Sequence, residues 1–273
     1  MIPVVIVGAG PAGLASSREL SRRGVEHIVI ERGEIGHTWA HLYDSLVLHT
    51  GKHLSSLPGL PFGSRTPLFP PRADFVEYLR SYAALFRLPV RTGVLVERIE
   101  RADGAWLVTT SGGPLQAGGV VMATGIVANP VVPPFPGRER FSGEVLHSVE
   151  YRRPAPFAGR RVLVVGAGNS AGEIAPELAR AGAAVTVSVR TGAVAVPRAL
   201  AGVPIQYFAV VASLLPARVQ QIVLRATARL GELRRGRSPL PAPPDEAGVC
   251  PDVPLIGFHL VDAIRQGLVR LAP

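Results

Sequence analysis

The chain has 273 residues, of which 47% are apolar and 18% are charged. This composition is typical of a folded globular protein and excludes a mainly disordered chain. No apolar run approaches the roughly 20 residues of a transmembrane helix, so no membrane span is expected. The first residues also lack the pattern of a secretory signal. Cys250 is the single cysteine, which excludes an internal disulfide or a redox-active cysteine pair, and we expect a cytoplasmic protein.

The formal net charge is +9, and two interpretations of it are open. A strongly basic chain is typical of nucleic-acid binding. The arginines, however, are spread along the sequence, and only the stretch 229–237 is dense in them. This favours an arginine-rich composition with sites for anionic dinucleotides. We therefore expect no nucleic-acid partner, and we predict no metal site.

Apolar runs and turn signals predict the elements of the N-terminal half. The opening indicates a strand, a glycine loop, a helix closed by Gly24 and a second strand, which together form the βαβ unit of a parallel sheet. An irregular stretch follows, and a later turn at Asp103 and Gly104 predicts a β-hairpin. The predicted strands are 3–7, 27–31, 94–99, 105–110 and 119–123, and the predicted helices are 11–23 and 74–86.

The opening pattern returns after a proline-rich stretch at 129–137. A strand at 161–165, a helix at 170–181 and a strand at 185–189 repeat its order, which indicates duplication of a supersecondary unit. We therefore predict an α/β fold with two Rossmann-like dinucleotide-binding domains in three layers. The predicted domains are 1–155 and 156–273, the second with a helical insertion within 203–237 and a later helix at 259–266. The insertion is expected to pack on the second domain. The alternatives are that it lines a substrate entrance or lies on a membrane surface.

The first glycine loop has the pattern GxGxxG between a strand and a helix. Glycine there allows a tight turn, close approach to a pyrophosphate and close packing of helix on strand, and the helix start attracts phosphate. An acidic residue at the end of the second strand suits unphosphorylated ribose. The alternative is a turn that serves packing alone. The residues predicted to bind FAD or NAD are Gly8, Gly10, Pro11, Ala12, Gly13 and Glu31.

The second glycine loop differs from the first in two ways. Its third glycine position is alanine, which the motif tolerates, and its second strand ends at arginine and threonine instead of glutamate. Arg and Thr can bind a 2′-phosphate that Glu would repel, which favours NADP at this loop. A surface arginine without a ligand is the alternative. The residues predicted to bind NADP are Gly166, Gly168, Asn169, Ser170, Ala171, Arg190 and Thr191.

Four further segments resemble one known family. The stretch 141–151 matches FxGxxxHxxxY through Phe141, Gly143, His147 and Tyr151. This is the motif of the class B flavoprotein monooxygenases, which include flavin-containing, N-hydroxylating and Baeyer–Villiger monooxygenases. MATG at 122–125 is similar to the family's ATG segment, and GHTW at 36–39 is similar to its GGTW. YDSLVLHT at 43–50 resembles the YDxLxLHxP run of the YUCCA-like branch.

The resemblance covers essentially the whole chain and implies a mechanism. FAD would bind at the first loop and NADPH at the second, and O2 would oxygenate a small organic substrate through a C4a-(hydro)peroxyflavin. The implied role of His147 and Tyr151 is to connect the domains and help hold NADP⁺, although a packing role for His147 is equally open. The resemblance adds the following residues to the FAD site: Arg32, Thr38, Trp39, Val96, Thr124 and Gly125.

His49 is the side chain to which the resemblance gives a catalytic role. Its run lies near the flavin ring in relatives, where a histidine can hydrogen-bond the oxygenated flavin or NADP⁺. The alternative is a polar loop residue with no part in the chemistry.

Members of the family usually run well past this length, so we expect a chain that is C-terminally truncated relative to them. Three interpretations of the shorter chain are open: it is a fragment, it is completed by a partner, or it has lost full catalysis. An FAD- and NADPH-dependent monooxygenase is the favoured function. The alternatives are a flavin-dependent NADPH oxidase or reductase and a non-catalytic nucleotide-binding protein. The run 43–50 slightly favours arylpyruvates among the family's substrates, and a homodimer is compatible with the sequence.

Overall fold

The computed structural model describes residues 1–190, 192–216, 219–220, 222–223, 226–227, 236–241 and 254–272. The chain forms two compact units, and each is described by itself. The first consists of Met1–Leu48 and Lys52–Arg152, and the second of His49–Gly51 and Arg153–Pro273. Each unit contains one of the two glycine loops.

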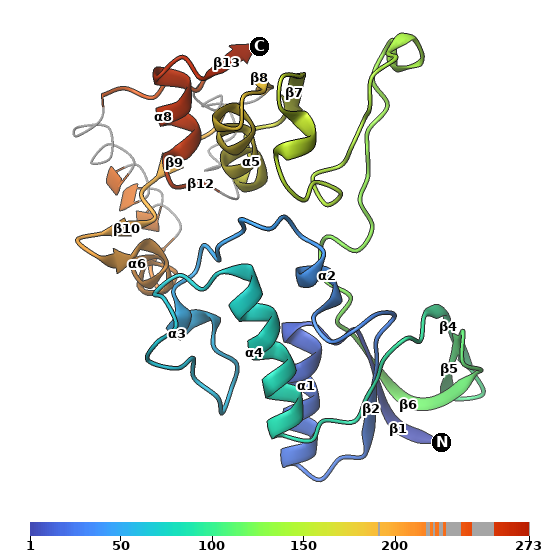
Figure 1. Cartoon of the computed structure of the whole chain (residues 1–273). Coiled ribbons are helices and arrows are strands. Elements are labelled where there is room, and N and C mark those ends of the chain that lie inside the picture. Colours follow the sequence, from blue (N-terminus) through green and yellow to red (C-terminus); the bar gives the residue numbers. More distant parts are fainter. Residues whose placement is uncertain are drawn as a thin grey trace. The chain divides into compact units, whose positions relative to one another are not determined.

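The first unit is built on a six-stranded sheet in the order β3-β2-β1-β6-β5-β4 (Figure 1). Strands β3, β2, β1 and β6 run parallel, with helices connecting β1 to β2 and β2 to β3, whereas β6, β5 and β4 form an antiparallel meander. The central strand β1 is flanked by β2 and β6. The strands are β1 (Ile2–Val7), β2 (His27–Ile30), β3 (Val90–Arg91), β4 (Val96–Ala102), β5 (Ala105–Thr110) and β6 (Leu115–Met122).

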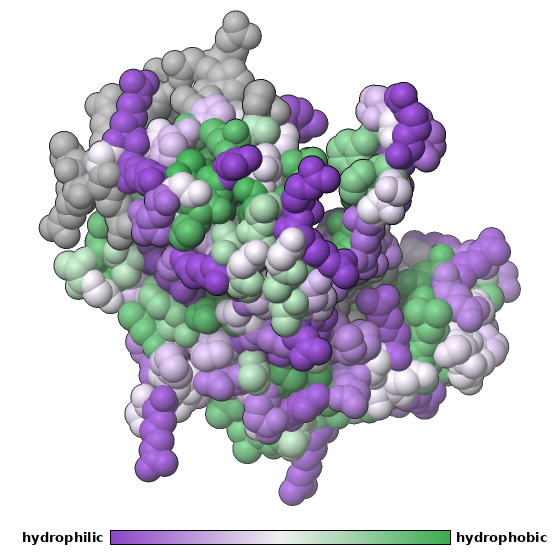
Figure 2. Space-filling view, turned by 45° about the horizontal axis from the view of Figure 1, so that its top comes forward, coloured by the Kyte–Doolittle hydropathy of each residue, from purple (hydrophilic) through white to green (hydrophobic). Residues whose placement is uncertain are grey.

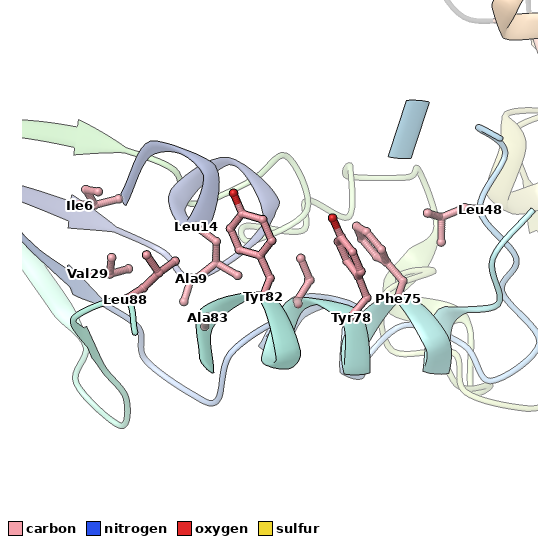
Figure 3. Close-up of a cluster of buried hydrophobic side chains, with 11 residues drawn as sticks. Ile6, Ala9, Leu14, Val29, Leu48, Phe75, Tyr78, Tyr82, Ala83 and Leu88 are labelled. Atoms are coloured by element: carbon pink, nitrogen blue, oxygen red, sulfur yellow. The ribbon is translucent and has the colours of Figure 1, made fainter. Parts of the chain in front are cut away.

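Helices pack on one face of this sheet around a buried core. Along α4, Phe75, Tyr78 and Tyr82 recur at helical spacing, with ring centroids 6.2 Å apart between neighbours. The three rings line the inner side of the helix, and Tyr82 lies nearest Leu14 of α1 (Figure 3). Ile6 of β1 and Val29 of β2 complete the other side of this core. The helices are α1 (Pro11–Arg22), α2 (His37–Ala40), α3 (Lys52–Ser55) and α4 (Arg72–Leu85).

A second cluster lies on the opposite face of β1 and β2. It contains Val5, Val7 and Ile30, which pack with Val108 and Ala117 of the antiparallel meander. Because side chains alternate along a strand, Ile6 belongs to the helical face and its two neighbours to this one. The central strands are therefore buried on both faces, as a parallel sheet requires.

The second unit contains a three-stranded parallel sheet in the order β13-β8-β7. Helices α5 and α8 pack on it through buried Ile174, Leu178 and Leu260. Its strands are β7 (Arg161–Val165), β8 (Ala184–Ser188) and β13 (Val269–Ala272), and its helices are α5 (Asn169–Arg180), α6 (Ile205–Ala212) and α8 (His259–Arg265). Short strands β9 (Ala195–Val196) and β12 (Leu255–Ile256) pair with each other, as do β10 (Ala199–Leu200) and β11 (Val203–Pro204). Two short 3-10 helices, Arg138–Arg140 and Ala155–Phe157, lie in the connection between the two sheets.

The structure confirms the predicted elements and corrects several boundaries. The helix predicted at 74–86 is Arg72–Leu85, since Pro71 supplies an extended residue before its first turn. The strand predicted at 119–123 begins at Leu115, because the meander pairs further than its apolar run extends. The hairpin turn is confirmed, with positive φ at Asp103 and Gly104. Within the predicted insertion, Ile205–Ala212 is helical, and much of 217–235 lies outside the described residues.

Large apolar side chains reach the surface in several places, as the green areas among purple ones in Figure 2 illustrate. In the second unit, Leu163 and Val165 of β7 are 62% and 60% exposed, and Val211 and Leu214 are also exposed. Across the described ranges, no helix has the length and apolar character needed to cross a membrane.

Candidate functional site

The first glycine loop is closely packed by its own unit. Gly8 has φ +106°, and a Cβ atom added there would lie 2.4 Å from the carbonyl oxygen of Ala123. A Cβ atom on Gly13 would lie 1.9 Å from the carbonyl oxygen of Gly8. Gly10 caps α1 with extended backbone, and a Cβ atom there would meet nothing within 4 Å. The loop therefore needs two glycines for packing and keeps open space in front of the third, beside Pro11 and Ala12 at the helix start.

Glu31 is buried directly behind this loop. One carboxylate oxygen accepts a hydrogen bond from the backbone N–H of Ala9 at 2.8 Å, and the other accepts from Gly33 N–H at 3.0 Å. Each oxygen keeps further acceptor capacity, since a carboxylate can accept about four hydrogen bonds. The carboxylate thus holds the loop to the end of β2, where ribose hydroxyls are expected.

The end of β6 completes the edge of this site. Ala123 contacts Gly8 through its carbonyl, and Thr124 and Gly125 follow it, Gly125 with positive φ and open space at its Cβ position. Val94 donates its backbone N–H to the carbonyl of Glu31 at 3.0 Å. Val94 therefore lies beside Glu31. Val96 follows it as the first residue of β4, where it pairs with Thr110 of β5. No sequence motif marked Val94, so this residue was not predicted.

The other predicted flavin-site residues differ in their surroundings. Arg32 is exposed next to Glu31, and Thr38 is half-buried in α2. The Trp39 ring packs edge-on against Phe75, with centroids 4.7 Å apart, so its partly buried indole contacts the core. The His37 and His41 rings are in contact, with centroids 4.1 Å apart and planes tilted by 40°. Burial lowers the pKa of His37, and the neighbouring His41 lowers it further.

The second glycine loop has the same backbone form in more open surroundings. Gly166 again has φ +106° and Gly168 again caps its helix, but an added Cβ atom at either would meet nothing within 4 Å. The Asn169 side chain accepts a hydrogen bond from Ile256 N–H at 2.8 Å, which anchors β12 to the start of α5. Ser170 is exposed and Ala171 is buried. Asn169 therefore has a structural partner in its own unit.

Arg190 follows β8 and is exposed, so its guanidinium is accessible to an anion. Its predicted companion Thr191 lies outside the described residues.

His49 lies in the second unit, next to the helix of the second loop. Its Nε2 is 2.8 Å from Oε1 of Glu173, and the two side chains are 21% and 16% exposed. Glu173 is four residues beyond Asn169 on α5, one helical turn from the loop. No sequence motif gave Glu173 a role, so this residue was not predicted.

The 141–151 motif is held by local contacts. A Cβ atom at Gly143 would lie 2.4 Å from the exposed Phe141 ring, so a side chain there would displace this ring. His147 accepts a hydrogen bond from Val149 N–H through Nδ1, and Tyr151 is buried near the Tyr43 ring. The next residue, Arg152, donates to the carbonyls of Ala40 and Leu42 and contacts Asp44. Tyr151 therefore anchors the motif to the first unit.

A sequence profile of the family described as Pyridine nucleotide-disulphide oxidoreductase matches residues 5–201. The chain is 37% identical to Indole-3-pyruvate monooxygenase YUCCA1 of Oryza sativa subsp. japonica over 279 residues, 98% of this chain and 68% of that protein. It is 35% identical to Probable indole-3-pyruvate monooxygenase YUCCA4 of Arabidopsis thaliana, with 98% and 67% covered. The chain belongs to the flavin-dependent monooxygenase family.

Solved structures agree with this family. A flavin-containing monooxygenase from Stenotrophomonas maltophilia aligns with a TM-score of 0.65 at 33% identity, over 69% of this chain and 58% of that one. A mutant of a flavin monooxygenase from the same organism aligns over 100% of this chain and 70% of that one, with a TM-score of 0.73 at 26% identity. The chain thus spans about two thirds of its plant relatives and less of the first bacterial structure.

These findings confirm the predicted family and the α/β fold class. They also confirm, at the level of the family, an NADPH-dependent oxidoreductase of the flavin monooxygenase type with FAD and NADP as cofactors. The residues present fit both cofactors, because each loop presents a helix start with open space before its central glycine, at Gly10 and at Gly168.

Proposed function

We propose that this chain is an FAD- and NADPH-dependent monooxygenase. The observation that carries the proposal is a pair of strand–glycine loop–helix units in one chain with opposite charges after their second strands. Glu31 lies at the first loop, and the exposed Arg190 lies at the second. A carboxylate favours ribose hydroxyls and disfavours a 2′-phosphate, and a guanidinium does the reverse.

Each set of residues has a distinct task in this proposal. Gly10 and the N-terminus of α1 receive the FAD pyrophosphate, and Glu31 binds its ribose. Gly168 and the N-terminus of α5 receive the NADPH pyrophosphate, and Arg190 pairs with its 2′-phosphate. Thr191 is proposed to assist Arg190. When bound, the two cofactors supply hydride transfer and activation of O2. The chain's own residues bind and orient the cofactors and the substrate, and they exclude water.

The remaining predicted residues belong to the same proposal. We propose that the flavin side is lined by the predicted residues Arg32, Thr38, Trp39, Val96, Thr124 and Gly125. Val94, which bonds the carbonyl of Glu31, is added to them. His147 is proposed to support the connection between the two domains. We retain the predicted division of the chain into an FAD-binding domain, 1–155, and an NADP-binding domain, 156–273.

An aromatic 2-oxo acid is the substrate class that we propose. Two similar proteins are named as indole-3-pyruvate monooxygenases. In a balanced reaction, the 2-oxo acid, O2, NADPH and a proton give the acid one carbon shorter, CO2, water and NADP⁺. The C1–C2 bond breaks, one oxygen atom enters the new carboxylate, and the other leaves as water.

We further propose that the protein acts in the cytoplasm, which suits a chain with a single cysteine. A small-molecule substrate and O2 are its proposed partners, and a homodimer is the proposed assembly. Size-exclusion chromatography with light scattering checks the assembly, since a monomer at micromolar concentration would contradict it.

The first experiment tests cofactor use by the 273-residue chain. The purified protein is mixed with FAD, and its visible spectrum is recorded before and after NADPH is added without air. We expect flavin absorbance that stays with the protein, bleaches with NADPH and returns in air. Failure to retain FAD would contradict the proposal and favour a nucleotide-binding protein without this catalysis.

The second experiment tests oxygen transfer. Phenylpyruvate or indole-3-pyruvate is incubated with NADPH and oxygen-18 gas, and the products are analysed by mass spectrometry. We expect one labelled oxygen atom in the arylacetate carboxylate. Label found only in hydrogen peroxide and water would identify an NADPH oxidase instead. Oxygenation of an amine or sulfide but not of 2-oxo acids would keep the monooxygenase and reject the substrate class.

A further inference from the structure

The His49–Glu173 pair has a geometry that the proposed function does not yet use. Residues 49–51 leave the first unit and belong to the second, although the chain on both sides belongs to the first. Gly51 fits there because a Cβ atom would lie 2.9 Å from the Pro204 side chain, just before α6. The backbone around His49 is thus held within the second unit by packing that is independent of the pair.

The pair specifies how the His49 ring is protonated. Nε2 lies 2.8 Å from a Glu173 carboxylate oxygen, and an ionised carboxylate can only accept a hydrogen bond. Nε2 must therefore carry the hydrogen. In the neutral ring the other nitrogen, Nδ1, then has a lone pair and acts as an acceptor. Within the described ranges of the chain, Nδ1 of His49 has no hydrogen-bond partner.

The position of Glu173 relates this acceptor to the second glycine loop. Asn169 and Glu173 are four residues apart and lie on one side of α5. On that side Asn169 binds the backbone of β12, and Glu173 binds His49. Four residues of helix rise by roughly 6 Å, so Glu173 lies about one helical turn from the loop at which the dinucleotide is expected to bind.

We propose that Glu173 is a positioning residue that fixes His49 in the Nε2–H form, so that Nδ1 accepts a hydrogen bond from the nicotinamide half of NADP. This inference rests on the proposed NADP site at the second loop. Arg190, at the end of β8, is assigned to the adenosine 2′-phosphate. This leaves the nicotinamide half for the pair of His49 and Glu173 beside α5. That half carries the required donors, which are the carboxamide N–H groups and the ribose hydroxyls.

Glu173→Gln tests the fixed ring orientation with little change in volume. A glutamine side chain can either accept from or donate to Nε2, so it no longer selects one tautomer. Isothermal titration calorimetry at pH 8, where an ordinary histidine is neutral, measures the affinity for NADP⁺ and for 2′,5′-ADP, which lacks the nicotinamide half. We expect Glu173→Gln to weaken NADP⁺ binding about fivefold, roughly the effect of one hydrogen bond, and to leave 2′,5′-ADP binding unchanged.

Two further variants serve as controls. Glu177→Gln makes the same change one turn further along α5 and is expected to leave both affinities unchanged. His49→Asn keeps an amide group near the position of Nδ1, whereas His49→Gln places it near that of Nε2. We expect the Asn variant to bind NADP⁺ more tightly than the Gln variant. Equal effects on NADP⁺ and 2′,5′-ADP, or no effect of Glu173→Gln, would overturn the proposal.

The tautomer itself is measurable in the protein before substitution. Nitrogen-15 NMR of the histidine rings at pH 8 separates Nε2–H from Nδ1–H forms, and the His49 signals are assigned as those lost in His49→Asn. We expect the Nε2–H form in the original chain and a mixture in Glu173→Gln. An Nδ1–H ring in the original chain would overturn the proposal. If neither NADP⁺ nor 2′,5′-ADP binds the original chain, the proposed NADP site has failed instead.

Discussion

The two glycine loops share one motif but differ in what surrounds them. In the first, added Cβ atoms at Gly8 and Gly13 would lie 2.4 Å and 1.9 Å from backbone oxygens. In the second, added atoms at Gly166 and Gly168 would meet nothing within 4 Å. The first loop therefore uses glycine for packing as well as for its ligand, and the second uses it for backbone conformation and ligand approach.

Sheet topology explains this difference. Strand β1 lies between β2 and β6, and the chain leaving β6 passes over Gly8 through Ala123. Strand β7 lies at an edge of its described sheet, with β8 as its neighbour, so no equivalent strand passes over Gly166. A shared motif thus predicts the ligand at both loops, but the neighbouring strand decides how much stability each glycine contributes.

Exchanging the residue at the third loop position is expected to have the largest effect. Gly13→Ala introduces the residue that the second loop carries at Ala171. Its Cβ atom would overlap the Gly8 carbonyl, which forces a backbone shift, and we expect a loss of about 3 kcal/mol in stability together with loss of FAD. Chemical denaturation and the FAD spectrum measure the two effects.

The matched variant is Ala171→Gly in α5. It removes one methyl group from a helix and is expected to cost only about 1 kcal/mol, the difference in helix propensity. Equal losses of stability in the two variants would show that the crowding of the first loop has no energetic consequence.

Reversing the charge after the second loop is expected to have the next largest effect, on the preference for NADPH over NADH. Arg190→Glu replaces a guanidinium with a carboxylate that repels a 2′-phosphate. The ratio of kcat/KM for NADPH to that for NADH should fall about 100-fold, or roughly 2.7 kcal/mol. Arg161→Glu, an exposed change at the start of β7, is the control and should leave the ratio unchanged. A ratio unaffected by Arg190→Glu would place the 2′-phosphate elsewhere.

Removing Glu31 is expected to have a smaller effect on stability than crowding the loop. Glu31→Ala leaves the N–H groups of Ala9 and Gly33 without their acceptor, at a cost of about 2 kcal/mol in the FAD-free chain. Glu34→Ala removes an exposed ion pair with Arg80 and should cost less than about 0.5 kcal/mol. Urea denaturation compares the two variants. Equal costs would show that the carboxylate does not hold the first loop.

The sequence was sufficient to predict the features that depend on local patterns. The βαβ units, the hairpin at Asp103 and Gly104 and the two glycine loops each follow from short-range turn and periodicity rules. Contacts between distant segments could not be predicted from the sequence. Val94 reaches Glu31 through the order of strands, and Glu173 reaches His49 across 124 residues. The contact of the Trp39 ring with Phe75 could not be predicted either, because a motif does not reveal which neighbour a ring will meet.

Protonation of His37, at the edge of the first loop, is expected to have the smallest effect on stability. Burial and the neighbouring His41 hold the pKa of His37 below the ordinary histidine value of about 6.5. The unfolded chain therefore takes up a proton at this residue before the folded chain does. As pH falls below about 6.5, the unfolded state is favoured, and this contribution to stability is lost by the time the pH is below the folded-state pKa.

Melting temperatures between pH 8 and pH 5 measure this effect in the original chain and in His37→Gln. The original chain should lose more stability below pH 6.5 than the variant does. The difference should be well under the roughly 2–4 °C that 1 kcal/mol is worth in a chain of this size, because the imidazole is only partly buried. His41→Gln is the control with the partner ring removed: its pH dependence should lie between the other two, since burial still lowers the pKa of His37. Identical pH dependence in all three proteins would show that His37 titrates as it does in the unfolded chain.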